Sequence, residues 1–418
     1  MTRHTLRAAL ATGAVLMTGA FVLSGCGGSG FEEPADTGSS GGLTSSDDAL
    51  ALLIGSSGEA ETTAVEDAVA AWSKDSGVKA TVQTANDLNQ QLAQGFAAGS
   101  PPDLFYLAPE AIAGYAGNGS LKAYGDELKN KDDFYPSLVD NFTFDGDFYC
   151  APKDFSTLQL IINTDLWAAA GLTDADVPTT WDQLTEVSKK LTTNGVVGLG
   201  FSNEYQRLGA FMAQAGGALV KDDKAVANSQ ENVDALTYVK DGLTGGYFGY
   251  AKDLGAGWGG EAFGKQLVAM VIEGNWITGA MKADYPDVKY TVAELPAGPK
   301  GQGTMQYTNC WGMAADSPNQ KAALDLAEYL TSTDQQLAFS KAFGPMPSIQ
   351  SAADQWSSDN PDLAAFLKGA DYAQFMPTQD GTQEVITDFN AQLESLKTSD
   401  PKQILDSVQS NLEAVVGG

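Results

Sequence analysis

Histidine and arginine are scarce in this chain of 418 residues. The sequence contains one histidine, His4, and its arginines are Arg3, Arg7 and Arg207. Three of these four residues lie ahead of an apolar run at the amino terminus. If that stretch is removed from the working protein, no histidine remains. This excludes a histidine general base, a histidine-containing catalytic triad and a histidine metal site, whereas carboxylate or lysine chemistry is not excluded.

The amino terminus has the pattern of a secretory leader. Arg3 and Arg7 precede an apolar run over residues 8–23 that is too short and too rich in glycine to span a bilayer stably. The run ends in Leu23-Ser24-Gly25-Cys26, which resembles the bacterial lipobox. That resemblance implies a signal peptide over residues 1–25, lipidation of the Cys26 sulfur, and attachment to the outer face of the cell membrane. Ordinary secretory cleavage that leaves a free cysteine is the alternative.

Acidic residues far outnumber basic ones. The chain has 53 Asp and Glu against 24 Lys and Arg, and loss of Arg3 and Arg7 with the leader brings the formal charge to about −31. Such a surface repels nucleic acid and anionic lipid, so neither is expected as a partner. A well-solvated exterior on an extracellular protein accounts for the charge.

The composition and patterning favour an α/β protein of two domains behind a tether. Residues 26–46 are mostly Gly, Ser, Asp, Glu and Thr, which predicts a flexible tether. About 390 residues with 43% hydrophobic content suggest two domains. Strands alternating with helices imply parallel pairing. The expected strands are residues 49–54, 78–82, 101–107 and 196–201, and the expected helices are 62–74, 88–98 (capped by Asp87), one beginning at Thr180-Trp181, and 205–215. Asp145-Gly146 marks a hairpin turn between residues 142–144 and 148–149.

Several separated segments resemble extracytoplasmic solute-binding proteins of carbohydrate ABC importers, the group that includes maltose-binding protein. The resemblance covers nearly the whole mature chain, and the segments occur in the family's order behind a lipobox. The matching segments are residues 99–106, 148–154, 160–165, 178–184, 262–265, 270–276, 311–314 and 317–319.

The resemblance implies a type II periplasmic-binding-protein fold, in which two lobes, each a sheet flanked by helices, are joined by hinge strands. Lobe 1 is expected at residues 47–155 with 291–335, and lobe 2 at 156–290 with 336–418. It also implies a monomer that binds a sugar between the lobes, closes on it, and delivers it to ABC importer permease subunits. No cofactor, metal or catalytic residue is expected.

Sugar capture requires flat aromatic faces for C–H groups and polar side chains for hydroxyls. Trp258 lies in a glycine-rich stretch that suggests a loop, and Trp276 matches the position of a sugar-stacking aromatic in the family. Trp311 begins a strand segment, with cleft and core about equally favoured. Trp72, Trp167 and Trp181 fall on amphipathic helical patterns and are expected in the core.

Arg207 stands out among the polar candidates because it is the only arginine after cleavage. Its planar guanidinium suits bidentate contact with hydroxyls, and a buried ion pair with a carboxylate is the alternative. Glu204 matches a family segment whose glutamate contacts sugar. Glu59 follows the first strand, where open α/β sheets bind ligands, although a helix-terminal acid explains it equally well. The weaker candidates are Asp154, Tyr106, Gln379 and Asp380.

Two cysteines, Cys150 and Cys310, remain besides Cys26. Paired thiols are common in exported proteins, which predicts a disulfide, while two separate buried thiols are the alternative.

Three classes of function are consistent with these features. The first is a binding component of a sugar importer, which explains the lipobox, the tether, the alternation and the missing histidine. An extracellular carbohydrate enzyme would require two carboxylates at a set separation, which composition does not test. A binding protein for a peptide, polyamine or organic anion is the third. The sequence favours the first.

Overall fold

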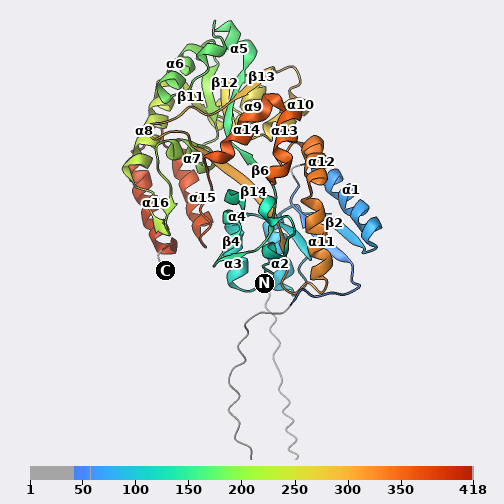
Figure 1. Cartoon of the computed structure of the whole chain (residues 1–418). Helices are drawn as coiled ribbons and strands as arrows, with labels where there is room; N and C mark the ends of the chain where they lie inside the picture. Colours follow the sequence, from blue (N-terminus) through green and yellow to red (C-terminus); the bar gives the residue numbers. More distant parts are fainter. Residues whose placement is uncertain (1–41, 57, 417–418) are drawn as a thin grey trace, which may run out of the picture. The chain divides into compact units, whose positions relative to one another are not determined.

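The computed structural model describes residues 42–56 and 58–416. The predicted signal peptide, Cys26 and the tether up to residue 41 lie outside these residues. The described body contains two main β-sheets, each covered by helices (Figure 1). No helix among the described residues is long and apolar enough to cross a membrane.

The first sheet has the order β15-β14-β3-β1-β2, and β6 also pairs with β14. Strand β1 is parallel to β2 and β3, whereas β14 is antiparallel to β3 and β6. Its strands are β1 (Leu50–Ile54), β2 (Ala80–Thr84), β3 (Leu104–Leu107), β6 (Ala151–Thr157), β14 (Thr304–Met313) and β15 (Ala373–Gln374). Helices packed with this sheet or beside it are α1 (Glu59–Ser76), α2 (Leu88–Ala97), α3 (Pro109–Gly117), α4 (Pro136–Asn141), α11 (Gln320–Leu330) and α12 (Thr333–Phe343).

The second sheet has the order β11-β8-β12-β7-β13. The parallel pairs β11–β8 and β8–β12 are followed by the antiparallel pairs β12–β7 and β7–β13. Its strands are β7 (Gln159–Asn163), β8 (Val197–Phe201), β11 (Phe248–Tyr250), β12 (Val268–Glu273) and β13 (Tyr290–Ala293). The helices after β6 that precede β14 are α5 (Thr164–Ala169), α6 (Trp181–Leu191), α7 (Tyr205–Gln214), α8 (Gln230–Gly245), α9 (Gly259–Gly264) and α10 (Ile277–Asp284).

The carboxy-terminal helices return to the second sheet. In Figure 1 α15 and α16 lie beside α7 and α8, and all four pack together. The helices in this carboxy-terminal part of the chain are α13 (Ala353–Asp359), α14 (Ala364–Lys368), α15 (Thr382–Leu393) and α16 (Pro401–Val416). The short elements are β4 (Thr143–Phe144), β5 (Asp147–Phe148), β9 (Val220–Lys221), β10 (Lys224–Ala225), η1 (Gly125–Glu127), η2 (Lys131–Asp133), η3 (Asp174–Asp176), η4 (Lys252–Leu254), η5 (Gln350–Ala352), η6 (Pro361–Leu363) and η7 (Gly369–Asp371).

Local sequence signals account for many of these elements. The Asp87 carboxylate accepts a hydrogen bond from the backbone N–H of Gln90, 3.0 Å away, and so caps α2 as predicted. Asp145 and Gly146 have φ values of 52° and 88°, which fits the predicted turn between β4 and β5. The four predicted strands appear as β1, β2, β3 and β8, each within a few residues of its expected bounds.

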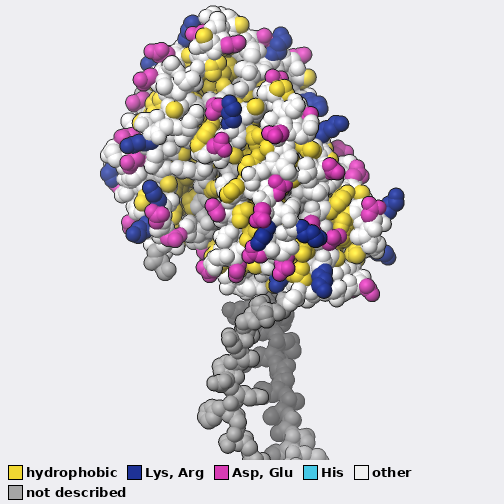
Figure 2. All heavy atoms as spheres, in the orientation of Figure 1, with side chains coloured by type: hydrophobic (Ala, Val, Ile, Leu, Met, Phe, Trp, Pro, Cys, Tyr) yellow, Lys and Arg dark blue, Asp and Glu magenta, His cyan; other side chains and the backbone are white. Residues whose placement is uncertain are grey.

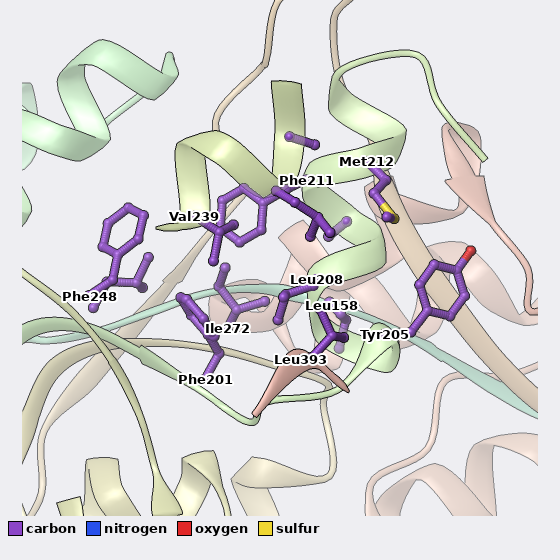
Figure 3. Packing of buried hydrophobic residues seen from close by; sticks show 14 of the residues in the cluster. Leu158, Phe201, Tyr205, Leu208, Phe211, Met212, Val239, Phe248, Ile272 and Leu393 are labelled. Atoms are coloured by element: carbon purple, nitrogen blue, oxygen red, sulfur yellow. The ribbon is translucent and has the colours of Figure 1, made fainter. Parts of the chain in front are cut away.

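Each sheet has its own hydrophobic core. Leu52, Trp72 and Phe105 lie in the core of the first sheet. Figure 3 shows the second core, where Phe201 of β8, Phe211 of α7 and Phe248 of β11 converge. Trp72, Trp167 and Trp181 are buried as predicted. A third buried cluster joins the two sheets, since it contains Phe155 of β6 together with Ile161 of β7 and Val271 of β12.

The chain passes from one sheet to the other where β6 runs into β7. Leu158, the single residue between these strands, donates its backbone N–H to the carbonyl of Met305 at 3.1 Å, and its own carbonyl accepts from the Thr304 hydroxyl at 2.7 Å. Strand β13 pairs within the second sheet over residues 290–293, past the predicted boundary at residue 290. The division into lobes by residue number stays a prediction.

Candidate functional site

A cavity of about 490 Å³ is lined from both sheets. Loops at the carboxyl ends of β1 and β3 provide one wall, and residues after β12 and β15 provide another. The crossing strands β6 and β14 contribute the floor. The lining residues are Gly55, Ser56, Glu61, Ala108, Pro109, Glu110, Asn141, Lys153, Asp154, Phe155, Ser156, Gln206, Asn275, Trp276, Gln306, Tyr307, Thr308, Asn309, Phe343, Gly344, Pro345, Phe375, Met376 and Gln383.

Trp276 gives this cavity an aromatic face. It follows β12 and immediately precedes α10, and at 36% exposure it is the one large apolar side chain that is exposed among the described residues. A Cβ on Gly274 would come within 2.2 Å of the indole ring, so only glycine there lets the ring fold back over the chain. The edge of the ring meets Tyr307, with centroids 5.7 Å apart.

A buried cluster of charged side chains contacts Trp276 through its indole N–H and beside its ring. The Glu273 carboxylate is fully buried, and its Oε2 accepts from the Trp276 Nε1–H at 3.0 Å and from Arg207 at 2.8 Å. Arg207 also pairs with Glu204 at 3.1 Å, and its guanidinium lies 5.3 Å from the Trp276 ring centre. Burial raises the pKa of Glu273, while Arg207 and Trp276 act in the opposite direction. The cluster fixes the orientation of the indole.

A second charged cluster lines the cavity from β6 and α1 of the first sheet. The Lys153 ammonium contacts Asp154, lies 3.1 Å from Oε1 of Glu61, and sits 4.4 Å from the centre of the Tyr106 ring. Burial acts to lower the pKa of Lys153, but the surrounding acidic groups outweigh it and raise the pKa above its ordinary value. Burial also raises the pKa of Asp154. Lys153 is therefore held as a cation.

The predicted site residues divide into those that line the cavity, those that lie behind Trp276, and those that do not reach the cavity. Trp276 and Asp154 line the cavity. Arg207 and Glu204 lie behind Trp276, with Arg207 in the ion pair that was the alternative interpretation. The Arg207 guanidinium is absent from the lining of this cavity, and its contact with a solute stays a prediction.

The remaining predicted residues do not reach the cavity. Trp311 and Tyr106 are each 1% exposed and pack edge to face, because the antiparallel pairing of β14 with β3 turns both rings into the core. Glu59 is exposed at the start of α1 and is absent from the lining, which instead contains Glu61. Trp258 is half-buried at the start of α9 and packs over Gly260. These four residues are absent from the lining of this cavity, and their contact with a solute stays a prediction.

Other cavity residues were missed by the sequence reasoning. Glu61 and Lys153 each lie within two residues of a predicted candidate, so a wider window around each candidate would have included them. Tyr307, Gln306 and Phe375 gave no such signal, since only tertiary structure brings β14 and β15 to the cavity.

A second cavity of about 500 Å³ adjoins the first and shares Asn141, Phe375 and Met376 with it. The loop that leads to the β9–β10 hairpin and residues 374–379 line it. Gln379 belongs to this second cavity and donates to Asp223 at 3.2 Å, whereas Asp380 is exposed and lines neither cavity. The lining thus extends well beyond Trp276.

Cys150 and Cys310 form a disulfide with their Cα atoms 5.7 Å apart, as predicted. It joins Cys150, the residue before β6, to Cys310 within β14. Next to it, the Tyr124 hydroxyl donates to the Trp311 carbonyl and accepts from the Ala151 N–H. The disulfide and these two hydrogen bonds together hold β6 against β14 within the first sheet.

Two α/β lobes with a polar cavity between them and an aromatic face on one wall define a class of solute-binding proteins. The chain belongs to the bacterial extracellular solute-binding protein family, whose model matches residues 67–365.

Two relatives illustrate the family. The diacetylchitobiose binding protein DasA of Streptomyces coelicolor is 27% identical and aligns over 65% of this chain and 66% of its own length. A maltooligosaccharide ABC transporter solute-binding lipoprotein of Streptococcus pneumoniae is 25% identical over 86% of this chain and 84% of its own.

Solved structures share the two-lobed fold. The cyclic alpha-maltosyl-1,6-maltose binding protein of Arthrobacter globiformis has a TM-score of 0.79 at 22% identity, covering 89% of this chain and 100% of its own. UgpB from Mycobacterium tuberculosis, in complex with glycerophosphocholine, has a TM-score of 0.78 at 18% identity, covering 88% and 98%. The predicted two-lobed α/β fold is confirmed by these similarities.

Proposed function

We propose that the protein captures a carbohydrate composed of several sugar units in the cavity between its lobes and delivers it to the permease of an ABC importer. The observation that carries the proposal is the exposed face of Trp276 above a rim of polar side chains. An apolar ring face suits sugar C–H groups, and the polar rim suits hydroxyls. The names of the relatives, which specify diacetylchitobiose and maltooligosaccharide, point the same way.

The charge of the cavity argues against an anionic solute. Glu61, Glu110 and Asp154 line it, against Lys153 as the single cation of the lining. An excess of carboxylates in a confined space repels phosphates and carboxylates. This makes the solute of UgpB, a phosphodiester, a poor model for the solute of this protein.

Titration of the purified protein with a solute panel tests the proposal. The panel contains maltotriose, N,N′-diacetylchitobiose, an arabinooligosaccharide and sn-glycerol 3-phosphate, and binding is followed by calorimetry and tryptophan fluorescence. We expect binding of at least one sugar, a change in tryptophan emission, and no binding of the phosphate. Absence of heat and of emission change with every sugar would overturn the carbohydrate assignment.

The variant Trp276→Ala tests the aromatic face. Loss of a stacking anchor should weaken sugar binding by about 2 kcal/mol, or roughly thirtyfold. Trp72→Phe is the matched control, because Trp72 is buried in the first core and donates to Asp325. It should lower stability and leave sugar affinity unchanged. Equal affinity of Trp276→Ala and the wild type would remove Trp276 from the site.

Binding without a chemical step is part of the proposal, since the family consists of solute-binding proteins. The bound sugar should be recovered unaltered after prolonged incubation, as judged by mass spectrometry. Detection of shorter or rearranged products would contradict this and favour an enzyme.

The proposal places the protein outside the cytoplasm as a monomer, held by lipid on Cys26. The motif Leu23-Ser24-Gly25-Cys26 and the lipoprotein among the relatives support the anchor. Cys26→Ala should move the protein from the membrane pellet to the soluble fraction with unchanged sugar affinity. Retention in the pellet would exclude this anchor, and gel filtration of the released protein tests the monomer.

A further inference from the structure

Gln306 is a buried amide with no hydrogen-bond partner among the described residues. It lies on β14, lines the cavity and is 1% exposed, and neither its Oε1 nor its Nε2 is paired. Burying an amide without a partner destabilises the folded state, because the amide loses its hydrogen bonds to water and no protein group replaces them. A polar group held in this way at a cavity wall points to a partner that arrives from outside the protein.

The other buried glutamines provide the comparison within the same molecule. Gln214 accepts from the Trp181 indole N–H at 2.6 Å and donates to the Gly303 carbonyl at 3.0 Å. Gln159 and Gln336 also have both ends of the amide paired with backbone groups. In these three glutamines both ends of the amide are paired and none of them lines the cavity, whereas Gln306 lines the cavity with both ends unpaired.

The position of Gln306 on β14 connects it to the junction between the sheets. It follows Met305, whose carbonyl accepts from the N–H of Leu158 at 3.1 Å at the point where the chain crosses between the sheets. It also stands opposite Thr157, the last residue of β6. A relative rotation of the two sheets would act on the backbone at this point and so change the surroundings of the amide.

We propose that Gln306 recognises the solute directly. When a sugar enters and the lobes close on it, the amide donates one hydrogen bond to a sugar hydroxyl and accepts another from a neighbouring hydroxyl. An amide offers one donor group and one acceptor group side by side, which matches a pair of adjacent hydroxyls. This inference rests on the proposed function and adds to it a specificity-determining residue. The solute provides the hydrogen-bond partners that the protein itself does not. The free-energy penalty of the buried, unpaired amide is therefore removed only in the complex.

The test compares Gln306→Met with the control Gln214→Met, because methionine preserves length and removes both polar atoms. For Gln306→Met we expect the melting temperature of the sugar-free protein to rise by about 1–3 °C. Its Kd for maltotriose, or for N,N′-diacetylchitobiose if that binds more tightly, should increase by about tenfold or more. Gln214→Met should melt at a lower temperature and bind with an unchanged Kd. If Gln306 has a purely structural role, Gln306→Met should also melt at a lower temperature and bind the sugar with an unchanged Kd.

A series of monodeoxy analogues of the same sugar provides a second test that does not depend on how the variant folds. For the wild type, removal of one of the contacted hydroxyls should weaken binding by about tenfold. The same removal should have little further effect in Gln306→Met. Equal effects of every deoxy position in both proteins, or an unchanged Kd of Gln306→Met, would overturn the inference. A wild type that binds no sugar would overturn the proposed function instead.

Discussion

Arg207 acts on the site through Trp276. The guanidinium of the largely buried Arg207 side chain pairs with the carboxylates of Glu204 and Glu273 and lies 5.3 Å from the centre of the Trp276 ring. Oε2 of Glu273 is shared by Arg207 and Trp276, so the ion pair and the orientation of the ring depend on one atom. A buried charge pair of this kind sets geometry at the expense of desolvation.

Arg207→Ala should therefore destabilise the protein more than it weakens binding. Its removal leaves the Glu273 carboxylate buried and unpaired, which costs about 3–5 kcal/mol of unfolding free energy. Adding Glu273→Gln to Arg207→Ala should restore most of the loss, because the amide carries no charge. Urea denaturation of the two variants measures both effects. A stable Arg207→Ala protein with strongly reduced sugar affinity would instead place the guanidinium on the solute.

At the scale of elements, helix α3 carries an acid into the cavity. Pro109 opens the helix and Glu110 follows in its first turn, where the helix dipole favours a negative charge. Burial nevertheless raises the pKa of the Glu110 carboxyl, against a smaller opposing effect of a backbone hydrogen bond. The ionised form of Glu110 is thus less stable in the folded protein than in the unfolded chain.

Glu110→Gln should stabilise the protein in a pH-dependent manner. A carboxyl whose pKa is raised by folding binds its proton more tightly in the folded state, so it reduces stability as the pH rises through that pKa. At pH 7 the variant should have the larger unfolding free energy. Below about pH 4, where the unfolded carboxyl is also protonated, the difference should vanish. Denaturation at several pH values measures it, and a constant difference would contradict the assignment.

The disulfide between Cys150 and Cys310 ties β6 to β14 across a sequence separation of 160 residues. Closing so long a loop restricts the unfolded chain, and its loss should lower the unfolding free energy by about 2–5 kcal/mol. In a Cys26→Ala background, the unfolded and unreduced protein should contain no free thiol. The double variant Cys150→Ala, Cys310→Ala should melt earlier and bind sugar with the same Kd. Two free thiols in the first measurement would show that the bridge does not form.

At the scale of the whole molecule, the two adjoining cavities provide room for a chain of sugar units. They share Asn141, Phe375 and Met376 and measure about 490 and 500 Å³. On the face shown in Figure 2, acidic and basic side chains are scattered among polar and apolar ones. An extended solute that spans both cavities buries more surface than a single sugar unit, and affinity should follow its length.

A length series tests this idea. The affinity for the preferred sugar should increase from one unit to about three or four and then level off, when both cavities are filled. Gln379→Ala should remove only the gain contributed by the longer sugars, because Gln379 lines the second cavity and its Oε1 has no partner among the described residues. Asp380→Ala, at an exposed position outside both cavities, is the control. Equal affinity for one unit and for four would exclude an extended site.

The sequence by itself determined what depends on neighbours along the chain. Asp87 reaches the N–H of Gln90 within its own turn, and Asp145-Gly146 adopts the turn that their conformational preferences favour. Strand β1 followed from an uninterrupted apolar run. The cysteine pairing followed from the count of thiols in an exported chain. The prediction that Trp276 contacts the solute followed from a family resemblance, and Trp276 does line the cavity.

Tertiary structure decided which of these residues face the cavity. Glu59 and Glu61 begin the same helix, but two positions correspond to about 200° around its axis, so only Glu61 points inward. Trp311 entered the core because β14 pairs with strands on both sides and is covered by helices. Arg207 found its partner Glu273 across the second sheet, 66 residues further along the chain. Sequence patterns act over a few residues, whereas the order and register of strands bring together residues that are hundreds apart, and the cavity is built from such pairs.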